Sequence, residues 1–122
     1  MRKMILLFVA ALFFLGAGPA LANKSAVRLE APVRAGQGEK ITIKVFVTHS
    51  ANNFFHHTKE VYLRINGQEA ARWEFSWTKL PEAADFSRTF EYVMDGPLTL
   101  ESAAFCNVHG SGNTATATVG LQ

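Results

Sequence analysis

The chain has 122 residues, of which 48% are hydrophobic and 18% are charged, and its 12 basic and 10 acidic side chains give a formal net charge of +2. Two of the basic residues, Arg2 and Lys3, precede an apolar N-terminal stretch, so the rest of the chain is balanced in charge. A balanced chain without a basic block lacks the electrostatic footprint of a nucleic-acid-binding protein, and this length predicts one small domain. We therefore expect no nucleic-acid partner.

The first 22 residues have the layout of a secretory signal peptide. Arg2 and Lys3 are followed by a nearly continuous apolar run over residues 4–15, and the segment ends in Ala20-Leu21-Ala22, a small-x-small cleavage signal. The apolar run is shorter than the roughly 20 residues of a membrane span, and an uncleaved anchor helix is the less favoured alternative. The sequence predicts cleavage before Asn23, a domain over residues 23–122 in the periplasm or elsewhere outside the cytoplasm, and no membrane span after cleavage.

Most of the remaining chain alternates apolar and polar residues in short segments, the pattern of half-buried strands. Strands are predicted over residues 27–32, 40–48, 60–65, 71–77, 86–93, 98–105 and 114–121. Asn66-Gly67 predicts a type I′ hairpin between the third and fourth of these strands. Trp73 and Trp77 share one face of the fourth strand, so we expect them to pack in the core rather than to form an exposed binding platform.

About seven short strands with turn signals between them, and no helix after residue 22, predict an all-β fold. The architecture that this pattern favours is an immunoglobulin-like antiparallel β-sandwich.

The single cysteine and all four histidines fall in two short stretches. Cys106 and His109 are three residues apart near the C-terminus, and His49, His56 and His57 lie around the connection between two predicted strands. One cysteine in an exported chain cannot form an internal disulfide, so it is a buried apolar residue, an intermolecular partner, a free reactive thiol or a metal ligand. The nearby imidazole favours the metal, and thiolate with imidazole suits iron, copper or zinc.

Strand ends can meet at one end of a sandwich, which places ligands in loops held by a rigid scaffold. The sequence therefore predicts one mononuclear metal site built from His49, His56, Cys106 and His109. His56 and His57 are adjacent and point to opposite sides if the backbone is extended, so only one of them should bind. We expect His57 to lie beside the site or in solvent, and its alternative role is to replace His56.

The run Cys106-Asn107-Val108-His109-Gly110 resembles the Cys-Asn-x-His-Gly iron-ligand motif of the superoxide reductases, the neelaredoxin and desulfoferrodoxin group. His49 and His56, separated by six residues, resemble the family's His-x5-His pair. The resemblance covers residues 27–119 and implies a mononuclear non-haem iron site, ferrous or ferric, with equatorial imidazoles and Cys106 as the axial thiolate. It also implies one-electron reduction of superoxide to hydrogen peroxide, with superoxide as substrate and an electron-donor protein as partner.

The chain departs from the family in the N-terminal Glu-Lys-His-x-Pro motif. The best match is residues 28–32, where Leu29 stands at the lysine position and Glu30 at that of the fourth histidine ligand. Glu30 either completes the site as a carboxylate ligand or stays solvated, and its flanking residues favour the second. Loss of the lysine should slow the capture of an anion, because local positive charge raises encounter rates. Lys59 is a candidate substitute, although a solvated strand lysine is the favoured interpretation.

Two functions from different classes follow. One is a periplasmic superoxide reductase-like iron protein, and the other is a non-catalytic metal-binding or electron-transfer module that serves an exported redox complex. The missing lysine and histidine favour the second more than a full match would. An adhesion-type sandwich without a metal is the least favoured, because the ligand types are clustered. The sequence makes no prediction of the oligomeric state.

Overall fold

The structure is a computed structural model that describes residues 24–122. The predicted signal peptide, residues 1–22, lies outside the described residues. Within the described part of the chain, no helix has the length and the apolar character needed to cross a membrane.

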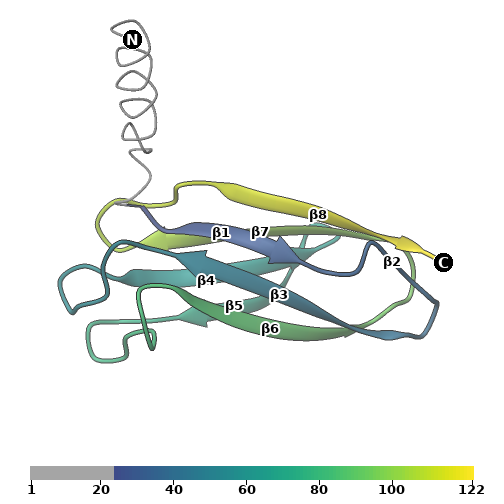
Figure 1. Ribbon diagram of the computed structural model, residues 1–122, viewed down its shortest axis with the longest axis horizontal. Coiled ribbons are helices and arrows are strands. Elements are labelled where there is room, and N and C mark those ends of the chain that lie inside the picture. Colours follow the sequence, from purple (N-terminus) through teal and green to yellow (C-terminus); the bar gives the residue numbers. More distant parts are fainter. Residues whose placement is uncertain (1–23) are drawn as a thin grey trace, which may run out of the picture.

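Eight strands account for the regular structure of residues 24–122 (Figure 1). They are β1 Ala26–Glu30, β2 Arg34–Ala35, β3 Lys40–Thr48, β4 Thr58–Ile65, β5 Gln68–Glu74, β6 Phe86–Val93, β7 Leu98–Cys106 and β8 Thr114–Leu121. A three-stranded sheet has the order β1-β3-β6, and a five-stranded sheet has the order β2-β8-β7-β4-β5. The predicted all-β sandwich is confirmed.

The sandwich is not wholly antiparallel, and it has one strand more than the sequence predicted. The additional strand, β2, pairs in parallel with β8, with Arg34 opposite Gly120 and Ala35 opposite Leu121. Two residues are too few to display a period-two pattern, so hydrophobic alternation could not reveal this strand.

The core lies between the sheets and follows the alternation of the strands. In β3 the side chains of Ile41, Ile43, Val45 and Val47 are buried, while Thr42 and Lys44 face solvent. In β4, Val61, Leu63 and Ile65 are buried in the same cluster. Each fully buried aliphatic side chain stabilises the fold by roughly 1.5–3 kcal/mol relative to its exposed state. Burial on this scale gives a rigid frame from which the connecting loops extend.

Of the predictions for the fourth predicted strand, residues 71–77, and the hairpin before it, one is confirmed and one is wrong. Asn66 and Gly67 both have left-handed backbone angles, with φ of 52° and 81°, as the predicted type I′ hairpin requires. The prediction for Trp77 is wrong, because its side chain is 67% exposed. Strand β5 ends at Glu74, and a turn closed by two backbone hydrogen bonds between Ser76 and Lys79 interrupts the alternation before it reaches residue 77.

Three connections meet at one end of the sandwich, which we call the ligand end. They are residues 49–57 between β3 and β4, residues 75–85 between β5 and β6, and residues 107–113 between β7 and β8. The strands that flank these connections end side by side, because Thr48 pairs with Ala26, Val47 with Phe86, and Thr58 with Cys106. Figure 1 shows these connections on the left of the view.

Candidate metal centre

Two histidines and the cysteine converge at the ligand end. One ligand atom from each of His49, His56 and Cys106 lies within 4.8 Å of the other two. His49 follows the last residue of β3, His56 lies in the connection before β4, and Cys106 is the last residue of β7. His49 and Cys106 are buried, and His56 is partly buried. These residues come from positions up to 57 apart in the sequence, so the sandwich itself brings them together.

His109 lies at the solvent edge of this group. Its side chain is exposed, and its ring centroid is 5.1 Å from that of His56, whose own ring is 4.7 Å from that of His49. The ligand atoms of His109 are not part of the group that lies within 4.8 Å. An exposed side chain changes rotamer on a picosecond to nanosecond timescale, so His109 has the freedom to approach an ion held by the other three. Ligation by all four residues remains a prediction.

A tight turn holds Cys106 and His109 on one short segment. The backbone N–H of Cys106 donates to the carbonyl of Gly110 at 3.0 Å, and that of Gly110 donates back to Cys106 at 3.2 Å. Gly110 has a φ of 77°, a conformation that an L side chain rarely adopts. Within the turn, the N–H of Val108 points at Cys106 Sγ at 3.4 Å. Cysteine binds metals as the thiolate, whose sulfur can accept such a hydrogen bond.

A second turn separates the two adjacent histidines. Asn53 and His56 exchange backbone hydrogen bonds of 2.9 and 3.2 Å, and Asn53 Oδ1 accepts from the N–H groups of Phe55 and His56. The ring of His57 is buried, and its Nδ1 lies 3.0 Å from the carbonyl oxygen of Asn53. A carbonyl only accepts, so Nδ1 carries the proton and is occupied as a donor. The geometry thus places His56 with the other ligand types and turns His57 away from them.

The position of His49 is fixed from a neighbouring connection. Its backbone N–H donates to Asp85 Oδ1 at 3.1 Å, which ties the end of β3 to the start of β6. Nearby, the Asn52 side-chain amide donates to the carbonyl of Pro81 at 2.8 Å. These bonds hold the start of the 49–57 connection against the 75–85 connection.

The donor set fits a transition metal. Nε2 of His56 is buried and has no hydrogen-bond partner within residues 24–122. A buried polar atom without a partner is unfavourable by about 1–3 kcal/mol, and a bound ion would remove that penalty. Imidazole nitrogen with thiolate sulfur is a donor set suited to iron, zinc and copper.

The residues aligned with the family's N-terminal motif lie away from this group. Glu30 is exposed, and its carboxylate forms an ion pair with Arg28 at 3.3 Å. It stands four residues beyond Ala26, which pairs with Thr48 at the ligand end, so it is about 13 Å along the strand from that end. Leu29 packs against the hydrophobic core, and the side chain of Lys59 is exposed on β4. The Glu30 carboxylate does not belong to the group of ligand atoms that lie within 4.8 Å of one another.

Sequence reasoning missed two asparagines that hold this site. The side chains of Asn53 and Asn107 both form hydrogen bonds to the backbone of the segment that carries His56. Asn107 belongs to the Cys-Asn-x-His-Gly motif, but the spacing of that motif does not indicate a contact with His57, 50 residues earlier in the chain.

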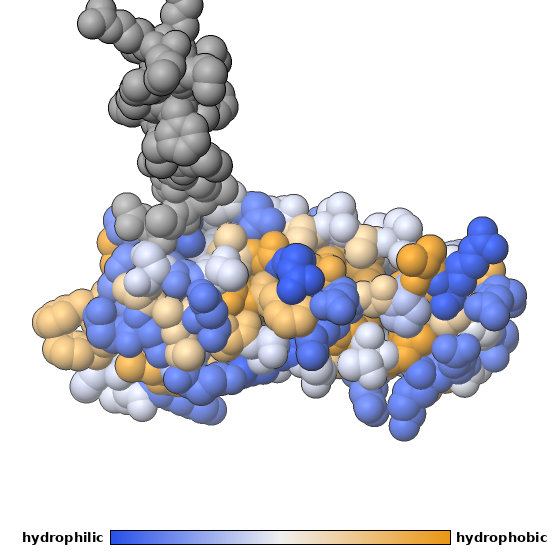
Figure 2. Space-filling model, in the orientation of Figure 1, coloured by the Kyte–Doolittle hydropathy of each residue, from blue (hydrophilic) through white to orange (hydrophobic). Residues whose placement is uncertain are grey.

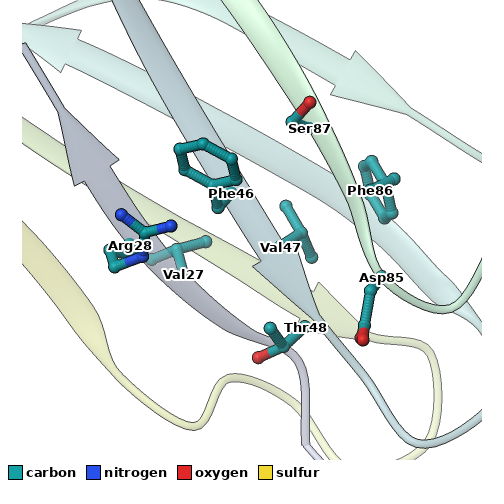
Figure 3. Close-up of a pocket in the computed structure, with 8 residues that line it drawn as sticks. All are labelled: Val27, Arg28, Phe46, Val47, Thr48, Asp85, Phe86 and Ser87. Carbon is teal, nitrogen blue, oxygen red and sulfur yellow. The ribbon is translucent and has the colours of Figure 1, made fainter.

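A pocket of about 550 Å³ lies beside the ligand end but is separate from the metal group (Figure 3). Its lining comes from β1, β3 and the start of β6: Val27, Arg28, Phe46, Val47, Thr48, Asp85, Phe86 and Ser87. The guanidinium carbon of Arg28 is 4.1 Å from the Phe46 ring centroid, so a cation–π contact covers part of its surface. Asp85 links the pocket to the site through its bond to the N–H of His49.

Two of the three connections at the ligand end carry no charged side chain, while the 75–85 connection carries Lys79, Glu82 and Asp85. Neither the 49–57 nor the 107–113 connection contains a lysine, arginine, aspartate or glutamate. Phe54, Phe55, Val108 and Trp77, all in the three connections, expose more than half of their side-chain surface. Figure 2 shows hydrophobic atoms protruding at this end.

Comparison with known families gives one match that covers most of the chain. A family model described as desulfoferrodoxin matches residues 20–114. Comparison with curated proteins gave no match.

Solved structures share the fold at low sequence identity. A superoxide reductase (neelaredoxin) from Ignicoccus hospitalis is 20% identical with a TM-score of 0.66, over 86% of this chain and 89% of the other. The reduced neelaredoxin from Archaeoglobus fulgidus is 22% identical with a TM-score of 0.52, over 79% and 89%. A CARDB domain from Pyrococcus furiosus, in complex with di-metal ions, is 17% identical with a TM-score of 0.62, over 84% and 97%. These likenesses support the immunoglobulin-like sandwich.

Proposed function

The chain belongs to the desulfoferrodoxin family, and from this premise we propose that it is an exported mononuclear non-haem iron protein with superoxide reductase-like activity. The observation that carries the proposal is the convergence of His49, His56 and Cys106 within 4.8 Å, with His109 beside them. Imidazoles from His49, His56 and His109 and the thiolate of Cys106 would hold the ion.

Bound iron would supply one-electron chemistry between its ferrous and ferric states. The chain's own residues prepare the donors for that ion. The N–H of Val108 donates to Cys106 Sγ, and the Asn53 turn holds His56, whose Nε2 is buried without a hydrogen-bond partner within residues 24–122. His109 is exposed to solvent beside His56 and would be the outermost of the four ligands.

The charges around the site predict weak capture of superoxide. Leu29 stands at the position of the family's lysine and packs into the core, and the 49–57 and 107–113 connections carry no cationic side chain. The 75–85 connection carries one cation, Lys79, and two acidic residues, Glu82 and Asp85. Without an excess of local positive charge, encounter with an anion loses its electrostatic acceleration, and its rate should depend little on ionic strength. We therefore expect slow superoxide reduction that is nearly insensitive to salt.

Pulse radiolysis of the reduced, iron-loaded chain tests the proposed activity. The native protein should consume superoxide faster than the buffer does, with little change between low and high salt. The Cys106→Ser variant, loaded with the same amount of iron, should lose this reaction because the charged soft donor is gone. An iron-loaded native protein that leaves superoxide decay unchanged contradicts the activity.

The second candidate is a non-catalytic electron-transfer module that serves an exported redox partner. Its support is the set of apolar side chains exposed around the site, Phe54, Phe55, Trp77 and Val108. Their combined surface is on the order of a few hundred Å², which suits a transient encounter with an electron-donor protein better than a permanent dimer. This function takes the place of the first if iron cycles reversibly between its two states with a small-molecule mediator while superoxide decay is unaffected.

Export is the remaining part of the proposal, and residues 1–22 support it through their sequence pattern. Intact-mass measurement of protein recovered from the periplasm should give a chain that begins at Asn23. A mass that still includes residues 1–22 would contradict a processed periplasmic protein.

A further inference from the structure

The side-chain amide of Asn107 spans the backbone on both sides of His56. Asn107 Oδ1 accepts a hydrogen bond from the N–H of His57 at 3.0 Å, and Asn107 Nδ2 donates to the carbonyl of Phe55 at 3.0 Å. These two atoms belong to the peptide groups that precede and follow the Cα of His56. A single planar amide therefore binds both peptide groups that determine where the His56 side chain points.

The backbone of Asn107 adds a third link to the same segment. Its N–H donates to the carbonyl of His57 at 3.0 Å, and the paired residues Thr58 and Cys106 come next in the register. The side-chain amide thus extends the pairing of β4 with β7 beyond the end of the ladder. Because Asn107 follows Cys106 directly, the same residue ties the His56 segment to the cysteine.

We propose that Asn107 is a positioning residue that holds His56 in register with Cys106 and so pre-forms the metal site. The inference rests on the proposed metal centre and adds a residue that acts through a ligand without being one. His56 lies in a connection of nine residues, 49–57, and each bond that orders this connection in advance lowers the entropy lost when the ion binds. Partners that orient metal ligands typically contribute 10–100-fold to metal affinity.

The chain supplies a matched control in the same connection. Asn113 also binds backbone with both ends of its amide, accepting from the N–H of Val27 at 2.8 Å and donating to the Val27 carbonyl at 2.9 Å. It holds β1, however, and not a segment with a ligand. Asn113→Ala removes two side-chain hydrogen bonds, and Asn107→Ala removes two bonds to the His56 segment together with a long contact of 3.8 Å from Cys106 Sγ. Both variants should lower Tm, while only Asn107→Ala should disturb the metal site.

Titration with Co²⁺ tests the proposal, because its absorption spectrum reports both affinity and ligand geometry. Asn107→Ala should weaken Co²⁺ binding by about 10–100-fold and shift the cobalt bands. Asn113→Ala should bind Co²⁺ with the native affinity and spectrum. In a His56→Ala background, Asn107→Ala should cause little further loss, because the two changes act through one ligand and are not additive.

Asn107→Asp provides a second variant if Asn107→Ala does not fold. Aspartate keeps the size of the side chain and the acceptor for His57, but it places a carboxylate against the Phe55 carbonyl, so Co²⁺ binding should again weaken. Native affinity in the folded Asn107 variants, or equal losses in Asn107→Ala and Asn113→Ala, would overturn the positioning role alone. A native chain that binds neither Co²⁺ nor iron would overturn the metal centre itself and the positioning role with it.

Discussion

Two adjacent histidines, His56 and His57, have different surroundings although the sequence treats them almost alike. Strand geometry predicted that only one of them would face the site, and family spacing favoured His56. The structure separates them through Asn53, whose carbonyl accepts the proton of the His57 ring while its side chain fixes the N–H of His56. Periodicity could not predict which of the two histidines would be turned away from the metal group. That choice depends on a hydrogen bond inside an irregular turn.

Replacing these histidines one at a time should have unequal effects on metal affinity. His56→Ala removes a donor atom from the group and should weaken Zn²⁺ binding by more than about 100-fold, beyond the usual effect of losing an outer partner. His57→Ala removes only a bond to the Asn53 carbonyl and should weaken Zn²⁺ binding by about tenfold or less. Competition with a chromophoric chelator measures both constants. A larger loss of Zn²⁺ affinity in His57→Ala than in His56→Ala would show that His57, and not His56, is the ligand.

Elements with long regular alternation were predicted well, and those without it were not. The strand over residues 40–48 was predicted with the bounds that β3 has, since four inward aliphatic residues alternate with outward polar ones. Strand β2 is too short to carry a pattern, and Trp77 was misplaced because β5 ends three residues before it. Hydrophobic alternation predicts a continuous strand, but it does not predict the residue at which the strand ends.

The hairpin between β4 and β5 offers a test that is confined to one element. Gly67→Ala places a Cβ on a residue with a φ of 81° and should destabilise the protein by about 1 kcal/mol. Gly36→Ala is the control, because its new Cβ would meet Glu39 Oε1 at an ordinary 3.7 Å. Urea unfolding should separate the two variants. Metal affinity should not change in either one, because the hairpin lies at the opposite end of the sandwich from the ligand end.

An ion pair between Glu82 in the 75–85 connection and Arg88 on β6 makes a contribution to stability that depends on pH. Two guanidinium nitrogens of Arg88 donate to the two carboxylate oxygens of Glu82 at 2.9 and 3.0 Å, and these bonds lower the pKa of Glu82 from its ordinary value of 4.5. A lowered folded pKa means that the stabilisation is present above pH 4.5 and is lost as the pH falls through the folded value. The effect should be small, because Glu82 is largely exposed.

Comparing the native protein with Glu82→Gln isolates this ion pair. The difference in urea midpoint between the two proteins should be measurable at pH 7 and should shrink toward zero under acid conditions below the folded pKa. A difference that grows on acidification would contradict the assigned direction of the shift.

At the scale of the whole molecule, the sandwich explains how ligands distant in sequence meet. Strands β3 and β7 lie in different sheets and both end at the ligand end, where the register brings β4 beside Cys106. The sequence predicted this convergence from ligand types at strand ends, and a family motif added the expected metal. It did not predict that His109 would lie outside the closest group, or that Asn107 would bridge to the His56 segment, because both depend on how two irregular loops pack.

We propose above all that this fold holds one metal ion through a thiolate and imidazoles. The most direct measurement is the metal content of the purified chain over residues 23–122, together with its electronic spectrum in the reduced and oxidised states. We expect one iron per chain and a thiolate-to-iron(III) charge-transfer band in the oxidised native protein, and we expect this band to be absent in Cys106→Ser. A native protein that takes up no iron, or a band that survives in Cys106→Ser, would contradict it.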